Sequence, residues 1–441
     1  MSWGPFTSAR SFLLLFLFLG LGSRICYGSG FGFDIHHRFS DPVKGILSLD
    51  GLPERGSVEY YAAMSHRDRL IRGRHLAASD GQTSPLTFVN GNETAMIGSL
   101  GFLHYANVSV GTPSLSFLVA LDTGSDLFWL PCDCMANSCV TALQTSSSWA
   151  CGQIQTGIFL EGAAPNGLFG LGIENISVPS TLARNGLASN SFALCFGRDG
   201  VGRISFGNNG SSDQGETPFN IRQLHPTYNI SITQITVGQN SSELEFSAIF
   251  DSGTSFTSLR DPAYTFISES FNSQIKEKRH TSDPQLPFDY CYYLSENQTS
   301  YVIPDVNLTM KGGDTYFLNN PTVVVGTEDG TVLYCLGLHK SDVNIDIIGQ
   351  NFMTGYQIVF DRERMVLGWK DSNCYNNQTS NNLPISPSQP PTVSPALPVD
   401  PEATGNNSQT PVAAPPTNHS PNLKSFTCTL AMLLVSFFAR V

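Results

Sequence analysis

Two short stretches of the chain share one pattern of apolar and polar positions. Residues 117–121 are all apolar, which is typical of a buried strand, and an Asp-Thr-Gly-Ser sequence beginning at Asp122 follows them directly. Residues 248–250 are also apolar, and they lead into an Asp-Ser-Gly-Thr sequence beginning at Asp251. A carboxylate therefore ends a core strand at two places in the chain.

A second element also occurs twice. Leu-Phe-Gly at residues 168–170 follows the first aspartate, and Ile-Ile-Gly at residues 347–349 follows the second. A single Asp-x-Gly sequence is a common turn signal, because aspartate hydrogen-bonds its own backbone and glycine adopts unusual backbone angles. Two such sequences, each after an apolar strand and each followed by an apolar-apolar-glycine element, indicate an internal repeat. We therefore expect two related lobes.

Helical periodicity is confined to short segments. We expect one helix over residues 58–71 and a second that begins at Pro179. A third is expected to begin at Pro262, with Asp261 as its cap. The side chains expected on the buried faces of the last two helices are Leu182 and Ala183, and Tyr264, Ile267, Phe271 and Ile275.

The composition favours strands and turns over a helical bundle. Of the 441 residues, 41% are hydrophobic, which allows a sizeable core, whereas only 14% are charged. Residues 105–110 alternate as a strand and end at a Gly-Thr-Pro turn. The fold class that we predict is all-β dominated and bilobal, with a few short helices.

The net charge of −12 is unevenly distributed. Residues 1–75 hold nine Lys and Arg against six Asp and Glu, so the remainder holds fifteen against thirty. An acidic body does not favour nucleic-acid binding, and the basic stretch at residues 66–75 is too short and mixed to indicate it. We expect that stretch to contact the acidic body itself, as a propeptide would.

Both ends of the chain have the composition of processing signals. Residues 12–21 form a short apolar run after Arg10, followed by small residues, which indicates a secretory signal peptide rather than a membrane-spanning helix. Residues 376–420 are rich in Pro, Ser, Thr and Asn, and the chain then ends in an apolar tail. This pattern predicts a glycosylphosphatidylinositol (GPI) anchor, with attachment between Asn406 and Ala414, although a helical tail anchor and an apolar tail without an anchor remain open.

Ten cysteines and eleven Asn-x-Ser/Thr sequons agree with the secretory pathway. We expect the protein at the extracellular face of the plasma membrane, held by its lipid anchor, or secreted. The sequons are at Asn92, Asn107, Asn175, Asn209, Asn229, Asn240, Asn297, Asn307, Asn377, Asn406 and Asn418. The predicted organisation is a signal peptide at 1–28, a propeptide at 29–95, a first lobe at 96–215, a second lobe at 216–375, a linker at 376–420 and the anchor signal at 421–441.

If a pseudo-two-fold axis relates the two lobes, Asp122 and Asp251 meet at it. Two carboxyl groups in contact cannot both stay ionised, so they share a proton and titrate as a unit. The ionised member can then take a proton from water while the other donates one to a substrate carbonyl, which hydrolyses a peptide bond without a covalent intermediate. The residues expected to support the two carboxylates are Thr123, Gly124, Ser125, Ser252, Gly253 and Thr254.

Other chemistries find little support in the sequence. It contains no Gly-x-Ser-x-Gly, no His-Glu-x-x-His and no phosphate-binding glycine loop with lysine. No spacing of His and Cys suits zinc, so we expect neither a metal nor a cofactor. The predicted partners are a protein or peptide substrate, the chain's own propeptide and a membrane, and the chain should be a monomer.

Residues 100–374 resemble the pepsin-like aspartic protease family, and in particular its plant members. The resemblance rests on the doubled Asp-Thr/Ser-Gly motif, and by it Asp122 and Asp251 match the catalytic pair. It also implies that residues 347–369 supply the closing strands of the second lobe. The disulfides implied by the resemblance are Cys291 with Cys335 and Cys195 with Cys374, whereas Cys132, Cys134, Cys139 and Cys151 allow several pairings.

The chain departs from the family pattern in its first lobe. Asp122 and Gly170 are 48 residues apart, whereas Asp251 and Gly349 are 98 apart. Family members carry a β-hairpin flap with a substrate-covering tyrosine in the first interval, and this chain has no tyrosine between Tyr105 and Tyr228. We therefore expect a truncated first lobe lacking the flap. An aspartic endopeptidase is the predicted function, and a catalytically impaired variant or a non-catalytic binding or inhibitor protein on the same fold is the alternative.

Overall fold

The structure is a computed structural model. It describes residues 31–47, 52–74, 86–87, 94–95, 103–110, 115–131, 151–152, 164, 166–220, 226–281, 285–295, 298, 300–374 and 392–393. The chain divides into two compact units, and all of the described residues belong to the unit that spans Gly30–Pro395. The predicted signal peptide, the anchor signal and almost all of the linker lie outside the described residues. Within the described part, no helix is long and apolar enough to cross a membrane.

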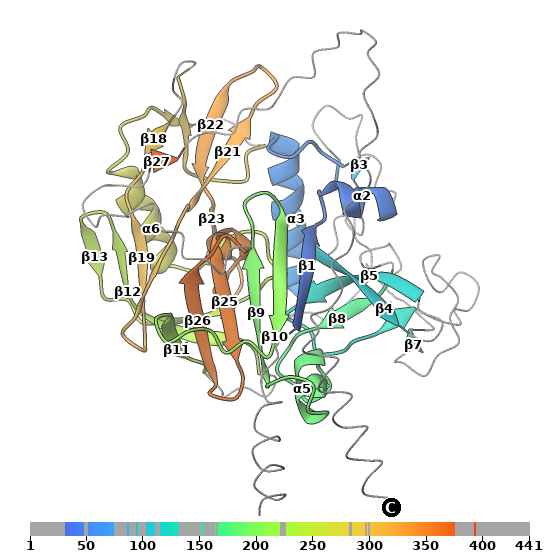
Figure 1. The fold of residues 1–441 in the computed structure, drawn as a ribbon. Coiled ribbons are helices and arrows are strands. Elements are labelled where there is room, and N and C mark those ends of the chain that lie inside the picture. The colour runs from blue at the N-terminus through green and yellow to red at the C-terminus, as the bar shows by residue number, and fades with distance from the viewer. Residues whose placement is uncertain are drawn as a thin grey trace, which may run out of the picture. The chain divides into compact units, whose positions relative to one another are not determined.

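A nine-stranded sheet joins segments from both halves of the chain (Figure 1). Its order is β11-β26-β25-β9-β10-β1-β4-β5-β8, so two strands near residue 360 pair with strands near residue 200. The strands are β1 (Phe31–His37), β4 (His104–Val110), β5 (Leu115–Asp122), β8 (Leu168–Gly170), β9 (Ser191–Phe196), β10 (Val201–Phe206), β11 (Gly215–Pro218), β25 (Tyr356–Asp361) and β26 (Val366–Asp371).

An eight-stranded sheet forms the core of the second lobe, and a four-stranded sheet accompanies it. The first contains β12 (Asn229–Val237), β13 (Asn240–Ser242), β14 (Phe246–Phe250), β15 (Thr257–Leu259), β19 (Val306–Met310), β20 (Thr315–Phe317), β23 (Leu338–Lys340) and β24 (Ile347–Ile348). The second contains β16 (Arg279–His280), β17 (Cys291–Tyr293), β21 (Thr322–Gly326) and β22 (Val332–Leu336). Three further pairs are β2 (Leu86–Thr87) with β3 (Thr94–Ala95), β6 (Leu130–Pro131) with β7 (Cys151–Gly152), and β18 (Tyr301–Val302) with β27 (Thr392–Val393).

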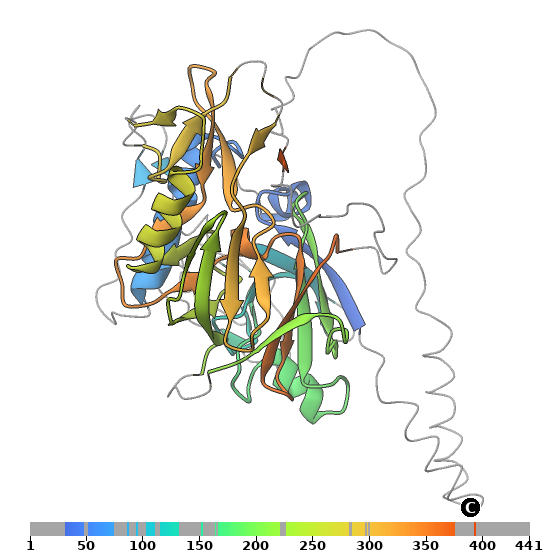
Figure 2. The same cartoon turned by 90° about the vertical axis from the view of Figure 1, so that its left-hand side faces the viewer.

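The helices are few and short, as predicted. They are α2 (Asp41–Leu47), α3 (Val58–Arg74), α5 (Val178–Arg184), α6 (Ala263–Asn272) and α7 (Gln350–Met353). The predicted helix over residues 58–71 corresponds to α3. Helix α6 lies against β12 and β23 of the second lobe (Figure 2).

Two details of the predicted helices differ in the structure. In α5, Pro179 and Ser180 are buried, whereas Leu182 and Ala183 are half-buried, although Leu182 packs against the core as expected. The N-cap position of α6 is Pro262, one residue after the predicted Asp261. The Asp261 carboxylate still accepts hydrogen bonds from Thr265 in the first turn of the helix, and it also forms an ion pair with Lys340. The expected apolar face of α6 is otherwise present, except that Ile275 lies beyond the end of the helix.

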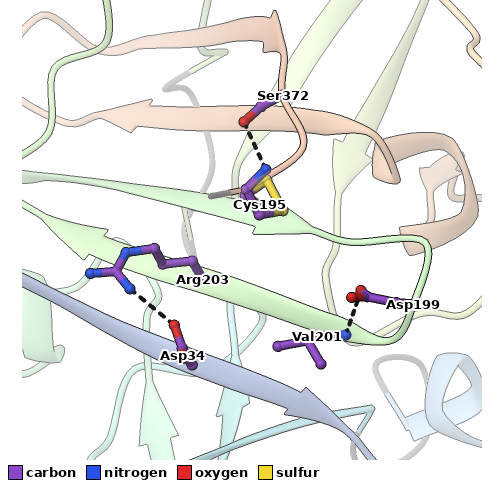
Figure 3. The surroundings of a disulfide bond; sticks show 7 residues. Asp34, Cys195, Asp199, Val201, Arg203 and Ser372 are labelled. Carbon is purple, nitrogen blue, oxygen red and sulfur yellow. Dashed lines mark hydrogen bonds and ion pairs between the residues drawn. A yellow bond between two sulfur atoms is a disulfide. The ribbon is translucent and has the colours of Figure 1, made fainter. Parts of the chain in front are cut away.

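Both disulfides implied by the family resemblance are present. Cys291 and Cys335 face each other across β17 and β22, and Cys195 of β9 is bonded to Cys374, just after β26. Figure 3 shows the second of these at the central strands of the nine-stranded sheet. This bond ties the segment after β26 to β9, which pairs with β25. Cys132, Cys134 and Cys139 lie outside the described residues.

Candidate active site

The two aspartate loops are built in the same way. In the first lobe β5 runs parallel to β8, so that Asp122 stands opposite Gly170. In the second lobe β14 runs parallel to β24, and the backbone N–H of Asp251 donates to Ile348 O at 3.1 Å. The repeat predicted from the sequence is thus a structural repeat: each aspartate follows a core strand that pairs with an apolar-apolar-glycine strand.

The glycine of each repeat allows the chain to cross itself. A Cβ atom on Gly170 would lie 2.3 Å from the backbone carbon of Asp126, and one on Gly349 would lie 2.7 Å from that of Phe256. Contacts of this length do not occur between real atoms, so any larger residue would push the aspartate loop aside. This requirement explains why both elements end in glycine.

The two carboxylates face a common space. A methyl group on Gly253 would lie 3.1 Å from Asp251 Oδ1 and 3.2 Å from Asp122 Oδ1, so both oxygen atoms border the same small volume. Each carboxylate is held by its own loop, because Gly124 N donates to Asp122 Oδ1 at 2.9 Å and Gly253 N donates to Asp251 Oδ1 at 2.8 Å. The structure therefore brings the two predicted aspartates together.

Direct hydrogen bonds connect the two loops. The backbone N–H of Ser252 donates to Thr123 Oγ1 at 3.1 Å, and the two side-chain hydroxyls are 3.2 Å apart. Thr123 is 4% exposed and Ser252 is 5% exposed, so water competes little for these bonds. The sequence predicts that these two residues support the carboxylates; in the structure their hydrogen bonds join the two aspartate loops to each other.

The fourth residues of the two loops act differently. Thr254 Oγ1 donates to Asp251 Oδ2 at 2.6 Å, as expected of a supporting hydroxyl. Ser125, at the matching position, has its hydroxyl oxygen buried without a hydrogen-bond partner among the described residues. Its backbone carbonyl accepts from Gly172 N at 2.8 Å instead. The structure thus supports a role beside a carboxylate for Thr254, whereas Ser125 contributes through its backbone.

A cavity of about 300 Å³ opens beside Asp251. Its other walls come from the start of β12, from β14 and from the segment that leads into β24. Arg260 lies at its edge and is tied to the buried Asp346, with Nη2 2.6 Å from Oδ2. The residues that line it are Thr123, Gly124, Thr227, Asn229, Ser247, Ile249, Asp251, Arg260, Asn344, Ile345, Asp346 and Ile347.

Helix α3, which lies in the predicted propeptide, packs against the second aspartate loop. Arg67 Nη1 donates to Gly253 O at 2.7 Å, two residues from the carboxylate of Asp251. Asp68 accepts from Ser255 N at 2.9 Å and from Phe256 N at 3.1 Å. The sequence predicts only that the mixed-charge stretch with Arg67 and Asp68 contacts the acidic body. It does not predict that these two residues contact the Asp251 loop.

Burial controls the electrostatics of this contact. Arg67 and Asp68 are each 1% exposed, and their charged groups are 2.6 Å apart. Removal from water raises the pKa of Asp68, while Arg67 and the hydrogen bonds from Phe256 and Ser255 act in the opposite direction. A buried pair of this kind stays ionised only if its geometry holds.

The predicted glycosylation sites differ in access. Asn107, Asn175, Asn209 and Asn240 are exposed, and Asn307 is half-buried. Asn229 is 6% exposed, and its side-chain oxygen accepts from Asn220 Nδ2 at 2.7 Å, so its side chain is buried in the folded lobe. Asn92, Asn297, Asn377, Asn406 and Asn418 lie outside the described residues. Among the residues that are described, no three His, Cys, Asp or Glu side chains gather as a metal site would require.

Comparisons with known proteins agree with this geometry. Residues 103–156 match the family model described as eukaryotic aspartyl protease, and residues 227–371 match the one described as xylanase inhibitor C-terminal. The chain is 50% identical over 495 residues to Aspartyl protease family protein 1 of Arabidopsis thaliana, which covers 93% of this chain and 95% of that protein. It is 31% identical over 464 residues to Aspartic proteinase-like protein 1 of the same plant, covering 84% and 86%.

A solved structure shows the same fold. The crystal structure of edgp superposes with a TM-score of 0.50 at 15% identity, over 61% of this chain and 91% of that one. The sequence relationships go further than the fold, because they extend over nearly the whole of both chains. The chain therefore belongs to the plant family of pepsin-like aspartyl proteases.

Proposed function

We propose that the chain is the precursor of an aspartic endopeptidase, with Asp122 and Asp251 as its catalytic pair. The observation that carries this proposal is that both carboxylates border the space beside Gly253, each fixed by an N–H of its own loop. A water molecule bound there would contact both groups. Family membership supports the same chemistry.

In the proposed reaction, one aspartate is ionised and the other carries a proton. The ionised member takes a proton from the bound water, which attacks the carbonyl carbon of the substrate peptide bond. The protonated member donates to the carbonyl oxygen, which gives a tetrahedral gem-diol intermediate. This intermediate then collapses as the aspartate that took the water proton donates it to the leaving nitrogen, and the other aspartate recovers its proton from a hydroxyl of the intermediate. No covalent bond forms between enzyme and substrate, and no metal or cofactor takes part.

A second candidate is that this form is catalytically impaired or serves as a binding or inhibitor protein. The short interval between Asp122 and Gly170 supports it, because 48 residues stand where the second lobe has 98. The alignment with the Arabidopsis relative also runs over 495 positions, more than the 441 residues of this chain, so the relative holds residues that this chain lacks. A missing flap would leave the cleft open to water. The name of the model that matches residues 227–371 makes xylanase an inhibitor target to test.

The disulfides and the family relationship support synthesis through the secretory pathway. We infer that residues 1–28 are removed, that residues 29–95 serve as a prosegment, and that residues 421–441 direct attachment of a GPI anchor at the extracellular face of the plasma membrane. The contact of Arg67 with Gly253 O supports the zymogen, because it places the prosegment helix on the Asp251 loop.

Cleavage of a denatured protein by the recombinant chain at acid pH tests the two candidates. We expect pepstatin-sensitive hydrolysis that is lost in Asp251→Asn and in Asp122→Asn. Loss in only one variant, or hydrolysis that survives in both, would show that the pair is not the catalytic centre. If the parent chain hydrolyses nothing while it still folds, the impaired or binding function is supported instead, and inhibition of a plant xylanase is the next assay.

A further inference from the structure

Two buried histidines meet where the proposed prosegment joins the first lobe. His37 is the last residue of β1, and it stands directly opposite His104 of β4 in the antiparallel ladder. The ring centroids are 5.2 Å apart, and the residues are 5% and 4% exposed. The pair therefore joins one strand of the proposed prosegment to one strand of the body, away from water.

The surroundings of the pair do not accommodate a positive charge. Phe39 stacks on His37, and Phe196 lies 4.7 Å from the ring of His104. His37 Nδ1 already accepts from Phe39 N at 3.3 Å, and His104 Nδ1 has no hydrogen-bond partner within the described part of the chain. A proton added to either nitrogen would thus meet a donor or apolar surface rather than an acceptor.

Charged neighbours oppose protonation as well. Burial lowers the pKa of His37 well below 6.5, and His104, Arg55, Arg67 and Arg38 lower it further. Burial, followed by Arg55 and His36, lowers the pKa of His104 to about 3. The arginines that act on the two rings are Arg38, directly after β1, Arg67 of α3 and Arg55 before α3, and all three are cationic.

We propose that the His37–His104 pair is an acid-sensitive switch that releases strand β1, and with it the prosegment, from the sheet of the first lobe. This inference rests on the proposed function, since it names the regulation of the same protease precursor. The released strand gives up its place between β10 and β4, and the contacts that α3 makes with the Asp251 loop are no longer tethered from the N-terminal side.

The sign of the effect follows from linkage. We call the form with β1 paired to β10 and β4 the closed form, and the form with β1 detached the released form. In the released form the two histidines regain an ordinary pKa near 6.5. Below that pH the released form therefore binds more protons than the closed form. The closed form is therefore fully stable above pH 6.5 and loses stability as the pH falls. For His104 alone, with a pKa of about 3 when closed, the shift at pH 4.5 is on the order of 100-fold in favour of release.

Other titrating groups in the prosegment modify the pH dependence of release without changing its direction. Burial lowers the pKa of His66, which adds to the acid response. Asp68 acts in the opposite direction, because burial raises its pKa and acid then stabilises the closed form. Tyr60 remains neutral throughout, since burial raises its pKa.

The other edge of β1 pairs with β10 over six residues, from Phe31 with Phe206 to His36 with Val201. The ion pair of Asp34 with Arg203 on β10 is 2.9 Å long, but its side chains are 47% and 41% exposed, and surface pairs contribute only about 0–1 kcal/mol (Figure 3). Only two residue pairs join β1 to β4, and one of them is His37 with His104. Protonation of this histidine pair therefore acts on a β1–β4 ladder that is only two residue pairs long.

Hydrogen exchange of the full-length precursor carrying Asp122→Asn and Asp251→Asn tests the switch without interference from proteolysis. Between pH 7.5 and 4.5, after correction for the intrinsic exchange rate, protection of the β10 amides should fall by about 100-fold. Protection of the β25 amides in the same sheet should change much less. In His104→Phe, and in His37→Phe, β10 should stay protected at pH 4.5.

The matched control is His280→Phe, a half-buried histidine of the second lobe, which should keep the full acid response of β10. His104→Gln, polar but not titrating, replaces His104→Phe if the latter lacks native protection at pH 7.5. The switch is refuted if both histidine variants lose β10 protection with the same pH dependence as the parent, or if the parent loses none. Because the assay needs no hydrolysis, a parent that releases β1 but cleaves no peptide would leave the switch standing and count against the proposed function alone.

Discussion

Thr123 Oγ1 accepts a hydrogen bond at 3.1 Å from the backbone N–H of Ser252, and the two residues belong to different lobes. This bond sits one residue after each of the two aspartates. Since both residues are buried, the bond fixes the position of one carboxylate relative to the other. The geometry proposed for catalysis therefore depends on a contact between lobes and not on either loop alone.

Thr123→Val should keep the fold but loosen this contact. It removes the acceptor of the Ser252 N–H, which remains buried, so we expect a loss of about 1–3 kcal/mol in the free energy of unfolding. Activity should fall more steeply than stability, because a small displacement of one carboxylate costs much of the rate. Urea unfolding and peptide hydrolysis measure the two effects.

Ser252→Ala provides the control for that prediction. It removes the hydroxyl 3.2 Å from Thr123 Oγ1 but keeps the backbone donor. We expect a smaller loss than in Thr123→Val, and a double variant whose effects are not additive, with a coupling of about 0.5–3 kcal/mol. Fully additive losses would show that the two side chains do not interact in solution.

Gly253→Ala should abolish activity with little effect on the fold. Its methyl group would lie 3.1 Å from Asp251 Oδ1 and 3.2 Å from Asp122 Oδ1, where the attacking water is proposed to bind. We expect at least a 100-fold decrease in kcat, since the reacting water would be displaced or misplaced. Gly326→Ala is the matched control, because no atom lies within 4 Å of its added methyl group. Equal activity of both variants would contradict the proposed position of the water.

The sequence predicted the site better than it predicted the surroundings of the site. The aspartate loops could be found because each combines an apolar strand, Asp-x-Gly and a distant apolar-apolar-glycine element, and Gly170 and Gly349 have the same steric reason to be glycine. Strand β1 could not be found in this way. Its pairing partners lie far along the chain, and its sequence contains charged and histidine residues that usually indicate a solvated segment.

The burial of charged residues is the second feature that could not be predicted from the sequence. Arg38, Arg67 and Asp68 are at most 1% exposed, although charged side chains are rarely buried unless paired. Their burial follows from tertiary contacts, such as that of Asp68 with the N–H groups of Ser255 and Phe256, which no local pattern reveals. The same holds for Asp261, which bonds Thr265 in the first turn of α6 but also forms a distant ion pair with Lys340.

Removal of the disulfide Cys195–Cys374 should cost more stability than removal of Cys291–Cys335. The first closes 179 residues and the second closes 44, so the chain-entropy model predicts a difference of about 1 kcal/mol in the free energy of unfolding. Urea unfolding of the two double-alanine variants measures it. A larger loss on removing Cys291–Cys335 would indicate that local packing around β17 and β22, and not chain entropy, sets the effect.

Arg67→Met should destabilise the precursor in a pH-dependent manner. It removes the guanidinium beside the buried carboxylate of Asp68, and breaking a buried ion pair costs about 3–5 kcal/mol. Since burial already raises the pKa of Asp68, the variant should raise it further; the cost is then full at neutral pH and shrinks as acid protonates the carboxylate. Urea unfolding of the inactive precursor at pH 7 and pH 4, each compared with its parent, measures this change. Arg69→Met, an exposed arginine on the same helix, should lose less than about 0.5 kcal/mol at either pH. Equal losses in the two variants, or a loss in Arg67→Met that does not vary with pH, would show that Arg67 does not stabilise the ionised Asp68.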